Sequence, residues 1–414
     1  MKFIADLHVH SKFSRATAKN LDLEHLYIWS QIKGITLVGT GDFTHPLWFK
    51  EIKEKLEPAE PGFFKLKDNI AKSCDKDIPL SCRNKVRFIL QCEISNIYKK
   101  NDKTRKNHHV IFVPDLASAE KFNSKLDAIG NIKSDGRPIL GLDAKKLLKI
   151  LLDTTSDGFL IPAHIWTPWF SVLGSKSGFD SIEECFEELF KEIFAAETGL
   201  SSDPPMNWRI PELDRLTLVS NSDAHSPSNL ARNANIFDID LSYYALRDAL
   251  KSKDPSRCLG TFDLYPEEGK YHMDGHRKCG VCLHPSESIK NKDICPVCKK
   301  PLTIGVLYRV ETLAKRQEGE KPKSALPCYH IIPLAEMLSE IIKCGTKSKK
   351  VMTKYNSMIE NFGPEIDILY QHSIDEISKS NIPMIGEAIK RMRSGKIHIQ
   401  PGFDGEFGKI SVFK

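Results

Sequence analysis

Several features that define common protein classes are missing from this chain of 414 residues. No apolar run approaches the ~20 residues needed to cross a bilayer, so a membrane protein is not expected. The chain has no Gly-rich loop of the P-loop nucleotide hydrolases and no Gly-x-Ser-x-Gly turn of the serine hydrolases. It also has no long repeat and no low-complexity tract. A globular protein with some other chemistry is therefore predicted.

A disulfide framework is also missing. Seven of the 11 cysteines are scattered without a pairing pattern: Cys74, Cys82, Cys92, Cys185, Cys258, Cys328 and Cys344. The chain has no signal peptide at its start, and free thiols persist in reducing compartments. We therefore expect a cytoplasmic protein.

Metal-ligand residue types are concentrated at the N-terminus, in Asp6-Leu7-His8-Val9-His10. The run is apolar enough to form a buried strand, and period-two alternation places Asp6, His8 and His10 on one face. A single histidine on a strand is usually structural. Burying three such groups on one face is costly unless a cation compensates, so the pattern favours a metal site.

Five further strand-like runs carry ligand-type residues at or near one end. The runs are residues 35–39, 86–90, 109–113, 159–163 and 216–220, and the residues are Asp42 and His45, Glu93, His109, His164, and Asp223 with His225. Helix-like segments lie between them at 22–33, 143–153, 181–190 and 243–252. Strand ends converge on one face of a β/α barrel, so we predict such a barrel over roughly the first 240 residues.

These motifs resemble the PHP (polymerase and histidinol phosphatase) family of metal-dependent phosphoesterases. The matching segments are Asp6–His10, Thr40-Gly41-Asp42 with His45, Pro162-Ala163-His164, and Ser222–His225. In the family the Asp and His of the second motif are adjacent, whereas Phe43 and Thr44 intervene here. The resemblance implies a distorted (β/α)7 barrel that hydrolyses phosphate esters with two or three divalent metals, Zn²⁺, Mn²⁺ or Mg²⁺.

The same resemblance implies which residues act. The implied metal ligands are His8, His10, Glu93, His109, His164, Asp223 and His225, and Asp42 and His45 are further catalytic candidates.

A second metal site is predicted from four cysteines in two Cys-x-x-Cys knuckles, Cys279 with Cys282 and Cys295 with Cys298. Paired knuckles at this spacing bring four thiolates to a tetrahedral structural Zn²⁺. Disulfides or chance are the less favoured alternatives. His276 and His284 lie close enough to be spare ligands.

Basic residues cluster in two short segments near the C-terminus. One contains Lys347, Lys349 and Lys350, and the other runs from Lys390 to Lys396. Either cluster alone is most simply a solvated helix face, and the net charge of +6 is modest. Combined with a zinc ribbon and a phosphoesterase barrel, the clusters favour contact with a nucleic-acid backbone.

The chain divides into three predicted domains. We expect a PHP barrel over residues 1–254, a zinc-binding region over 255–333 with its ribbon at 275–302, and a mostly helical, basic DNA-binding domain over 334–414. Pro364 and Pro383 should separate helices within the last domain.

Taken over its full length, the chain resembles the PHP-domain nucleases of DNA repair, which combine these three parts. The most specific segments are residues 6–19, 39–46, 197–208, 222–227 and 345–351. The resemblance implies cleavage of DNA on the 5′ side of deaminated bases (uracil, hypoxanthine and xanthine) and of abasic sites. DNA is thus the expected partner. The tail is a candidate for docking on a sliding clamp, although it contains no convincing clamp-binding peptide.

An enzyme that selects a damaged base in a duplex must flip it into a pocket with aromatic faces and amide groups. Trp166, Trp169 and Phe170 follow a ligand-bearing strand, and Asn207 precedes another. Packing of these residues at the barrel rim is an equally good interpretation.

Two rival functions remain open. A small-molecule phosphatase of the histidinol-phosphate type would share the barrel but would not need a ribbon or basic clusters. A non-catalytic DNA-binding protein with a decayed PHP site would not need so complete a ligand set.

Overall fold

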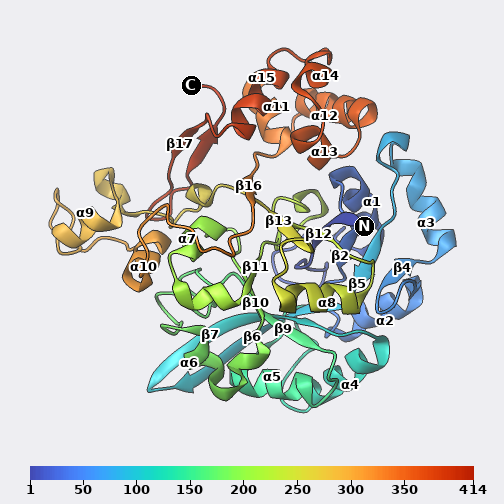
Figure 1. Ribbon diagram of the computed structural model, residues 1–414, viewed down its shortest axis with the longest axis horizontal. Helices are drawn as coiled ribbons and strands as arrows, with labels where there is room; N and C mark the ends of the chain where they lie inside the picture. The colour runs from blue at the N-terminus through green and yellow to red at the C-terminus, as the bar shows by residue number, and fades with distance from the viewer.

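An eight-stranded mixed sheet forms the centre of the molecule, which the computed structural model describes over residues 1–414 (Figure 1). Its strands, in spatial order, are β16 (Cys328–His330), β13 (Cys258–Asp263), β12 (Ala234–Asp238), β1 (Lys2–Asp6), β2 (Leu37–Gly39), β5 (Arg87–Ile89), β4 (Phe64–Leu66) and β3 (Leu56–Pro58). β1 pairs in parallel with β2 and antiparallel with β12.

A second sheet of four strands has the order β8 (Ile139–Leu140), β6 (Gln91–Lys100), β7 (Lys103–Phe112) and β9 (Phe159–Pro162). Three strand pairs complete the set: β10 (Ala195–Glu197) with β11 (Thr217–Val219), β14 (Asp274–His276) with β15 (Val281–Leu283), and β17 (His398–Gln400) with β18 (Lys409–Ser411). The hydrogen-bonded ladders therefore do not close into one barrel.

Eight helices accompany these sheets. They are α1 (Leu23–Lys33), α2 (Pro46–Lys55), α3 (Asp68–Cys74), α4 (Leu116–Asp127), α5 (Ala144–Leu152), α6 (Ile182–Phe186), α7 (Pro204–Trp208) and α8 (Tyr243–Ser252). Of these, α1, α5, α6 and α8 fall in the four predicted segments. Side chains of Asp22, Asp115, Asp143, Ser181 and Ser242 accept hydrogen bonds from backbone N–H groups at the starts of α1, α4, α5, α6 and α8. Such caps satisfy N–H groups that a helix leaves unpaired.

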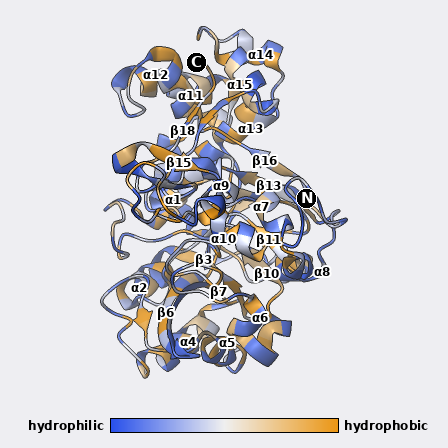
Figure 2. Cartoon of the chain, turned by 90° about the vertical axis from the view of Figure 1, so that its left-hand side faces the viewer, coloured by the Kyte–Doolittle hydropathy of each residue, from blue (hydrophilic) through white to orange (hydrophobic).

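The C-terminal region is helical, as predicted. After α9 (Pro285–Lys290) and α10 (Val306–Leu313) come α11 (Leu334–Ile342), α12 (Lys349–Phe362), α13 (Glu365–Tyr370), α14 (Ile374–Ser378) and α15 (Ile385–Arg393). Pro364 precedes α13 directly, and Pro383 lies just before α15. The C-terminal helices lie at one end of the molecule and α4, α5 and α6 at the other, in both views (Figures 1 and 2). No helix combines the length and the apolar character that crossing a bilayer requires.

Two apolar cores hold these layers together. A cluster of 77 buried residues runs continuously from the N-terminal sheet into the C-terminal helices. A smaller cluster of 20 buried residues collects side chains of β1, β2, β5, β7, β9, β10, β11, β12 and β13 beneath α8. The strands that carry the predicted ligands thus surround a common interior.

Candidate metal centre

The first group of metal-ligand atoms comes from His8, His10 and Asp223, whose side-chain donors lie within 4.8 Å of one another. His8 and His10 follow the end of β1, and Val9 between them forms a bridge with Ala224. Asp223 has a positive φ of 47°, a conformation that Asp tolerates better than most residues. The His10 Nε2 atom lies 2.9 Å from an Asp223 carboxylate oxygen.

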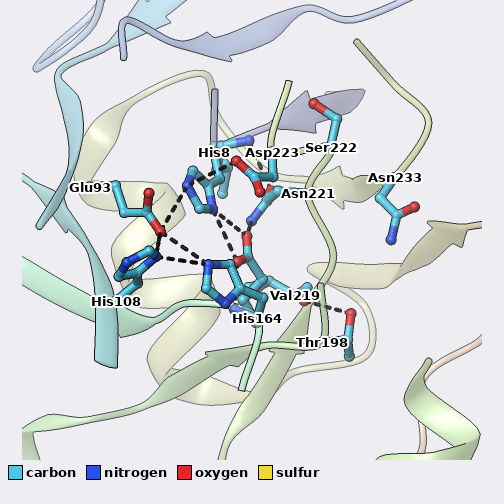
Figure 3. A network of polar contacts seen from close by, with 12 residues as sticks. His8, Glu93, His108, His164, Thr198, Val219, Asn221, Ser222, Asp223 and Asn233 are labelled. Carbon is cyan, nitrogen blue, oxygen red and sulfur yellow. Dashed lines mark hydrogen bonds and ion pairs between the residues drawn. The ribbon is translucent and has the colours of Figure 1, made fainter. Parts of the chain in front are cut away.

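The second group contains Glu93 on β6, His108 on β7 and His164 just after β9. An oxygen of Glu93 lies 2.8 Å from His108 Nδ1 and 3.1 Å from His164 Nε2. Glu93 also lies 3.7 Å from His8 (Figure 3) and 3.4 Å from His10, so its carboxylate joins the two groups. We refer to the six residues together as the metal cluster.

The charges in the metal cluster indicate a need for cations. Burial disfavours the ionised Glu93 carboxylate, but His108, Arg137 and His8 hold its pKa well below its usual value. Burial likewise opposes a charged His8, yet the Glu197 and Glu93 carboxylates raise its pKa well above normal. The pKa of His10 rises to about 9 because Asp42 and Asp223 outweigh its burial. The carboxylates thus favour positive charge on His8 and His10, a role that divalent metals can take over.

The donor set also fits divalent metals. Imidazole nitrogens with carboxylate oxygens suit Zn²⁺ or Mn²⁺. The buried Nε2 atom of His8 has no hydrogen-bond partner and faces the Glu93 and Asp223 carboxylates at 3.7 and 3.8 Å. These separations are too long for hydrogen bonds but leave the facing atoms able to share a cation.

Two carboxylates outside the metal cluster contact the Nδ1 atoms of His8 and His10. Glu197, at the end of β10, lies 3.0 Å from His8 Nδ1 and accepts hydrogen bonds from Asn221 Nδ2 and His164 N. Asp42 lies 3.2 Å from His10 Nδ1 and accepts from Ser11 and Ser14. Such outer contacts orient imidazole ligands. The Glu197 contact is one that the sequence interpretation missed.

Besides Asp42, three predicted residues lie outside the metal cluster. His45 Nε2 contacts the Lys133 carbonyl at 3.1 Å, and its ring stacks on Phe13. His225 borders the cluster, with its ring centroid 4.6 Å from that of His10. His109 faces away, and its ring packs against Phe186.

His108 faces Glu93, and the predicted His109 does not, because of strand register. In the β6–β7 ladder Ser95 is opposite His108 and Ile94 is opposite His109. Glu93 and Ser95 share one face of β6, and directly opposed residues share a face, so His108 lies on the side of Glu93. Asp6 does not join the cluster either: its carboxylate accepts from Ser222 N and Ala231 N.

The donor atoms that lie closest together in the ribbon are not those of the predicted four cysteines. Donor atoms of His276, Cys279, Cys295 and Cys298 lie within 4.8 Å of one another, whereas Cys282 lies outside this set. In the β14–β15 ladder His276 is opposite Val281 and Cys282 is opposite Gly275. His276 and Cys282 therefore point to opposite faces of the hairpin. A Cys3His group is a common tetrahedral zinc set.

The predicted DNA-contact residues divide by exposure. Trp166 is fully buried and donates from Nε1 to the Asn207 side chain at 2.8 Å, so this pair packs inside the molecule. Trp169 is 52% exposed, and Phe170 lies beside the His108 ring at 4.8 Å. Lys347, Lys349 and Lys350 are all exposed around the start of α12.

The sequence of the chain is similar to one protein family and to two curated proteins. Residues 333–396 match a family described as the MJ0043 C-terminal domain. The chain is 38% identical over 256 residues to the uncharacterized protein MJ0043 of Methanocaldococcus jannaschii, covering 60% of this chain and 31% of that protein. It is 29% identical to the uncharacterized protein YqxK of Bacillus subtilis over 99% of both chains. The chain thus spans about a third of the archaeal relative and nearly all of the bacterial one.

Two solved structures resemble the whole chain. One is the lesion-specific endonuclease PfuEndoQ from Pyrococcus furiosus, with a TM-score of 0.86, 31% identity and coverage of 99% of this chain and 95% of that one. The other is endonuclease Q in complex with a 27-mer duplex that carries an abasic lesion at the active site, with a TM-score of 0.84, 30% identity and coverage of 100% and 97%. Because the structural similarity covers the full length, the chain is assigned to the nucleases of mixed α/β fold. It belongs to the endonuclease Q family. Nothing in these comparisons supports a sliding clamp as a partner.

Proposed function

We propose that the chain is a metal-dependent endodeoxyribonuclease that hydrolyses the phosphodiester on the 5′ side of deaminated bases and abasic sites in DNA. The observation that carries the proposal is the metal cluster, in which Glu93 joins two groups of buried histidines and carboxylates. The family membership supports nuclease chemistry, and the related complex with an abasic duplex supports damaged DNA as the substrate.

The metal cluster is proposed to hold at least two divalent metals, with His8, His10 and Asp223 as one ligand group and Glu93, His108 and His164 as the other. Bound metals would lower the pKa of a water and stabilise charge on the phosphate. The protein supplies orientation: Glu197 fixes the His8 ring, and Asp42 fixes the His10 ring. His225 borders the first group and is proposed to contact either a further metal or the leaving oxygen.

We further propose that the strand arrangement is an open form of the PHP barrel. Side chains from nine strands share one apolar core, although their ladders are separate. A structural Zn²⁺ is proposed for His276, Cys279, Cys295 and Cys298.

Base reading is proposed for Trp169 and Phe170. Trp169 is about half exposed, and the Thr167 hydroxyl, which donates to the Trp169 carbonyl, also lies 3.3 Å from His164 Nδ1. The loop is therefore tied to the metal cluster. Lys347, Lys349 and Lys350 are proposed to bind the phosphate backbone of the DNA.

One set of assays separates this function from its rivals. A 5′-labelled duplex with a single deoxyuridine is incubated with the metal-loaded protein and run on a denaturing gel, beside a binding assay and a histidinol-phosphate hydrolysis assay. We expect one cut on the 5′ side of the deoxyuridine. Phosphate release from histidinol phosphate without a cut would favour the small-molecule enzyme, and DNA binding without any hydrolysis would favour the decayed site.

A further inference from the structure

Arg137 lies between the metal cluster and solvent. Its Nη1 atom donates to Glu93 Oε2 at 3.0 Å. The Glu93 side chain is fully buried, whereas the Arg137 side chain is 24% exposed. The Arg137 side chain thus reaches solvent beside a carboxylate that does not.

The loop that carries Arg137 is held by residues that lie close after the first ligand motif or within the second. Gly136 N donates to the Phe13 carbonyl at 3.0 Å, and the Lys133 carbonyl lies 3.1 Å from His45 Nε2. A Cβ atom on Gly136 would lie 2.4 Å from an Asp42 carboxylate oxygen and from Ser14 Oγ, so only glycine permits this approach. The loop is therefore packed directly against the residues that orient His10, and Arg137 enters the site from a fixed backbone.

Most of the hydrogen-bonding capacity of Arg137 is unused. Nη1 bonds Glu93, while Nε and Nη2 bond no other protein group. An arginine side chain does not lose its charge, and its planar fork matches the oxygens of a phosphate. If both Glu93 oxygens ligate metals, the cation remains at the rim of the site with donors free to bind a second anion.

We propose that Arg137 binds a nonbridging oxygen of the scissile phosphate and stabilises the charge that grows there during cleavage. This inference rests on the proposed nuclease function and adds a substrate-binding residue to it. A purely structural Arg137, which only neutralises Glu93, would affect metal content or folding but would not affect phosphate binding by the metal-loaded protein.

The test compares the full-length Arg137→Ala and Arg137→Lys variants with wild type, after each is loaded with Mn²⁺. Metal per chain is measured first, followed by the affinity for inorganic phosphate by calorimetry, and then single-turnover cleavage of the deoxyuridine duplex. Arg247→Ala is the matched control. It removes another arginine–carboxylate pair, but its partner Asp157 precedes β9 while His164 follows that strand.

We expect Arg137→Ala to keep its metals, to bind phosphate about 10-fold or more weakly, and to cleave about 100-fold more slowly. Arg137→Lys should be intermediate because it keeps the charge without the fork. Added guanidinium ions should partly restore cleavage by Arg137→Ala and leave wild type unchanged. Wild-type phosphate affinity in Arg137→Ala, or a rate loss that parallels lost metal, would overturn the inference. Failure of wild type itself to cut DNA would instead reject the proposed function.

Discussion

Glu93 is fully buried on β6 and contacts His108, His164 and Arg137 at 2.8, 3.1 and 3.0 Å. Its carboxylate is surrounded by these groups, and His108 and Arg137 help to hold its pKa well below the usual value. Substituting these residues one at a time should therefore distinguish metal ligands from residues that only neighbour them.

The first prediction concerns the adjacent pair His108 and His109. His108→Ala should lower metal affinity and reduce single-turnover cleavage by about 10- to 100-fold or more, because it removes a group that contacts Glu93. His109→Ala should keep cleavage within about 3-fold of wild type, since its ring packs on Phe186 away from the cluster. Cleavage of the deoxyuridine duplex with metal analysis of each variant checks this. The reverse pattern would restore His109 as the ligand.

The second prediction concerns the ribbon. Cys295→Ser should lose about one zinc per chain, as expected for a tetrahedral site that loses a ligand. Cys282→Ser is the matched control and should retain the zinc, since Cys282 faces the other side of the β14–β15 hairpin. Zinc is measured after mild chelation. Loss of zinc from Cys282→Ser with retention in His276→Ala would support the four-cysteine set instead.

The β6–β7 hairpin shows how far the bounds and the register of a strand could be predicted from the sequence. The apolar run beginning at His109 was recognised, but the strand starts earlier, at Lys103. Asn101 and Asp102 both have positive φ and form a two-residue turn that pairs Lys100 with Lys103. This turn fixes the register along the whole ladder and places His108 on the face of Glu93. The Asn101-Asp102 pair in the sequence therefore indicates a hairpin turn, from which the position of His108 on the face of Glu93 could have been predicted.

Other elements were well predicted because their signals are local. The expected helix at 243–252 is α8, and the expected segment at 22–33 is α1 with its cap Asp22. Glu197 and Arg137 could not be predicted, because each acts on a residue tens of positions away, through pairings that no local pattern encodes.

The third prediction concerns the start of α12. Replacing Lys347, Lys349 and Lys350 together with Ala should weaken binding similarly for damaged and undamaged duplexes and flatten the salt dependence of affinity, since fewer phosphates displace fewer counterions. Lesion preference should survive, because phosphate contacts do not identify a base.

The control replaces Lys121, Lys146 and Lys149, which are equally exposed on α4 and α5 at the opposite end of the molecule (Figure 1). This variant should keep the wild-type salt slope in a titration of binding. If the α12 variant kept its slope but lost lesion preference, the helical region would have to read the base.

The whole molecule is joined across its predicted domain boundaries. β13 and β16, from the segment assigned to the zinc region, are strands of the central sheet, and one core continues into the C-terminal helices. Composition alone could not reveal these long-range pairings, which cross the predicted boundaries near residues 254 and 333. A buried polar group at the junction of α1 and α13 makes this continuity testable.

The fourth prediction concerns that group. Glu365 is buried, pairs with Lys33, and accepts hydrogen bonds from Tyr355 at 2.6 Å and from Leu334 N at 2.9 Å. Glu365→Ala leaves Lys33 unpaired and should lower the free energy of unfolding by about 3–5 kcal/mol. The exposed Glu360→Ala variant should change it by less than about 0.5 kcal/mol. Urea unfolding measures both, and equal values would show that the junction does not depend on this pair.

The pH dependence of this contribution has a defined sign. Burial raises the pKa of Glu365, but Lys33 and the hydrogen bonds outweigh it and lower the pKa below its unfolded value. The stabilisation is therefore present above the unfolded pKa and is lost as the pH falls through the folded one. The difference between wild type and Glu365→Ala should shrink on the acid side.

The central claim is that the buried metal cluster cuts damaged DNA with bound metal. Its most direct test is a metal titration of the single-turnover cleavage rate, measured on the 5′-labelled deoxyuridine duplex with chelated wild type and chelated His8→Ala. Wild type should be inactive without metal and regain a single cut on the 5′ side of the deoxyuridine as Mn²⁺ or Zn²⁺ is added. His8→Ala should bind the duplex but stay below about a tenth of the wild-type rate at every metal concentration, since a lost ligand costs several kcal/mol of transition-state stabilisation. Full cleavage by chelated wild type, or by His8→Ala, would contradict the account.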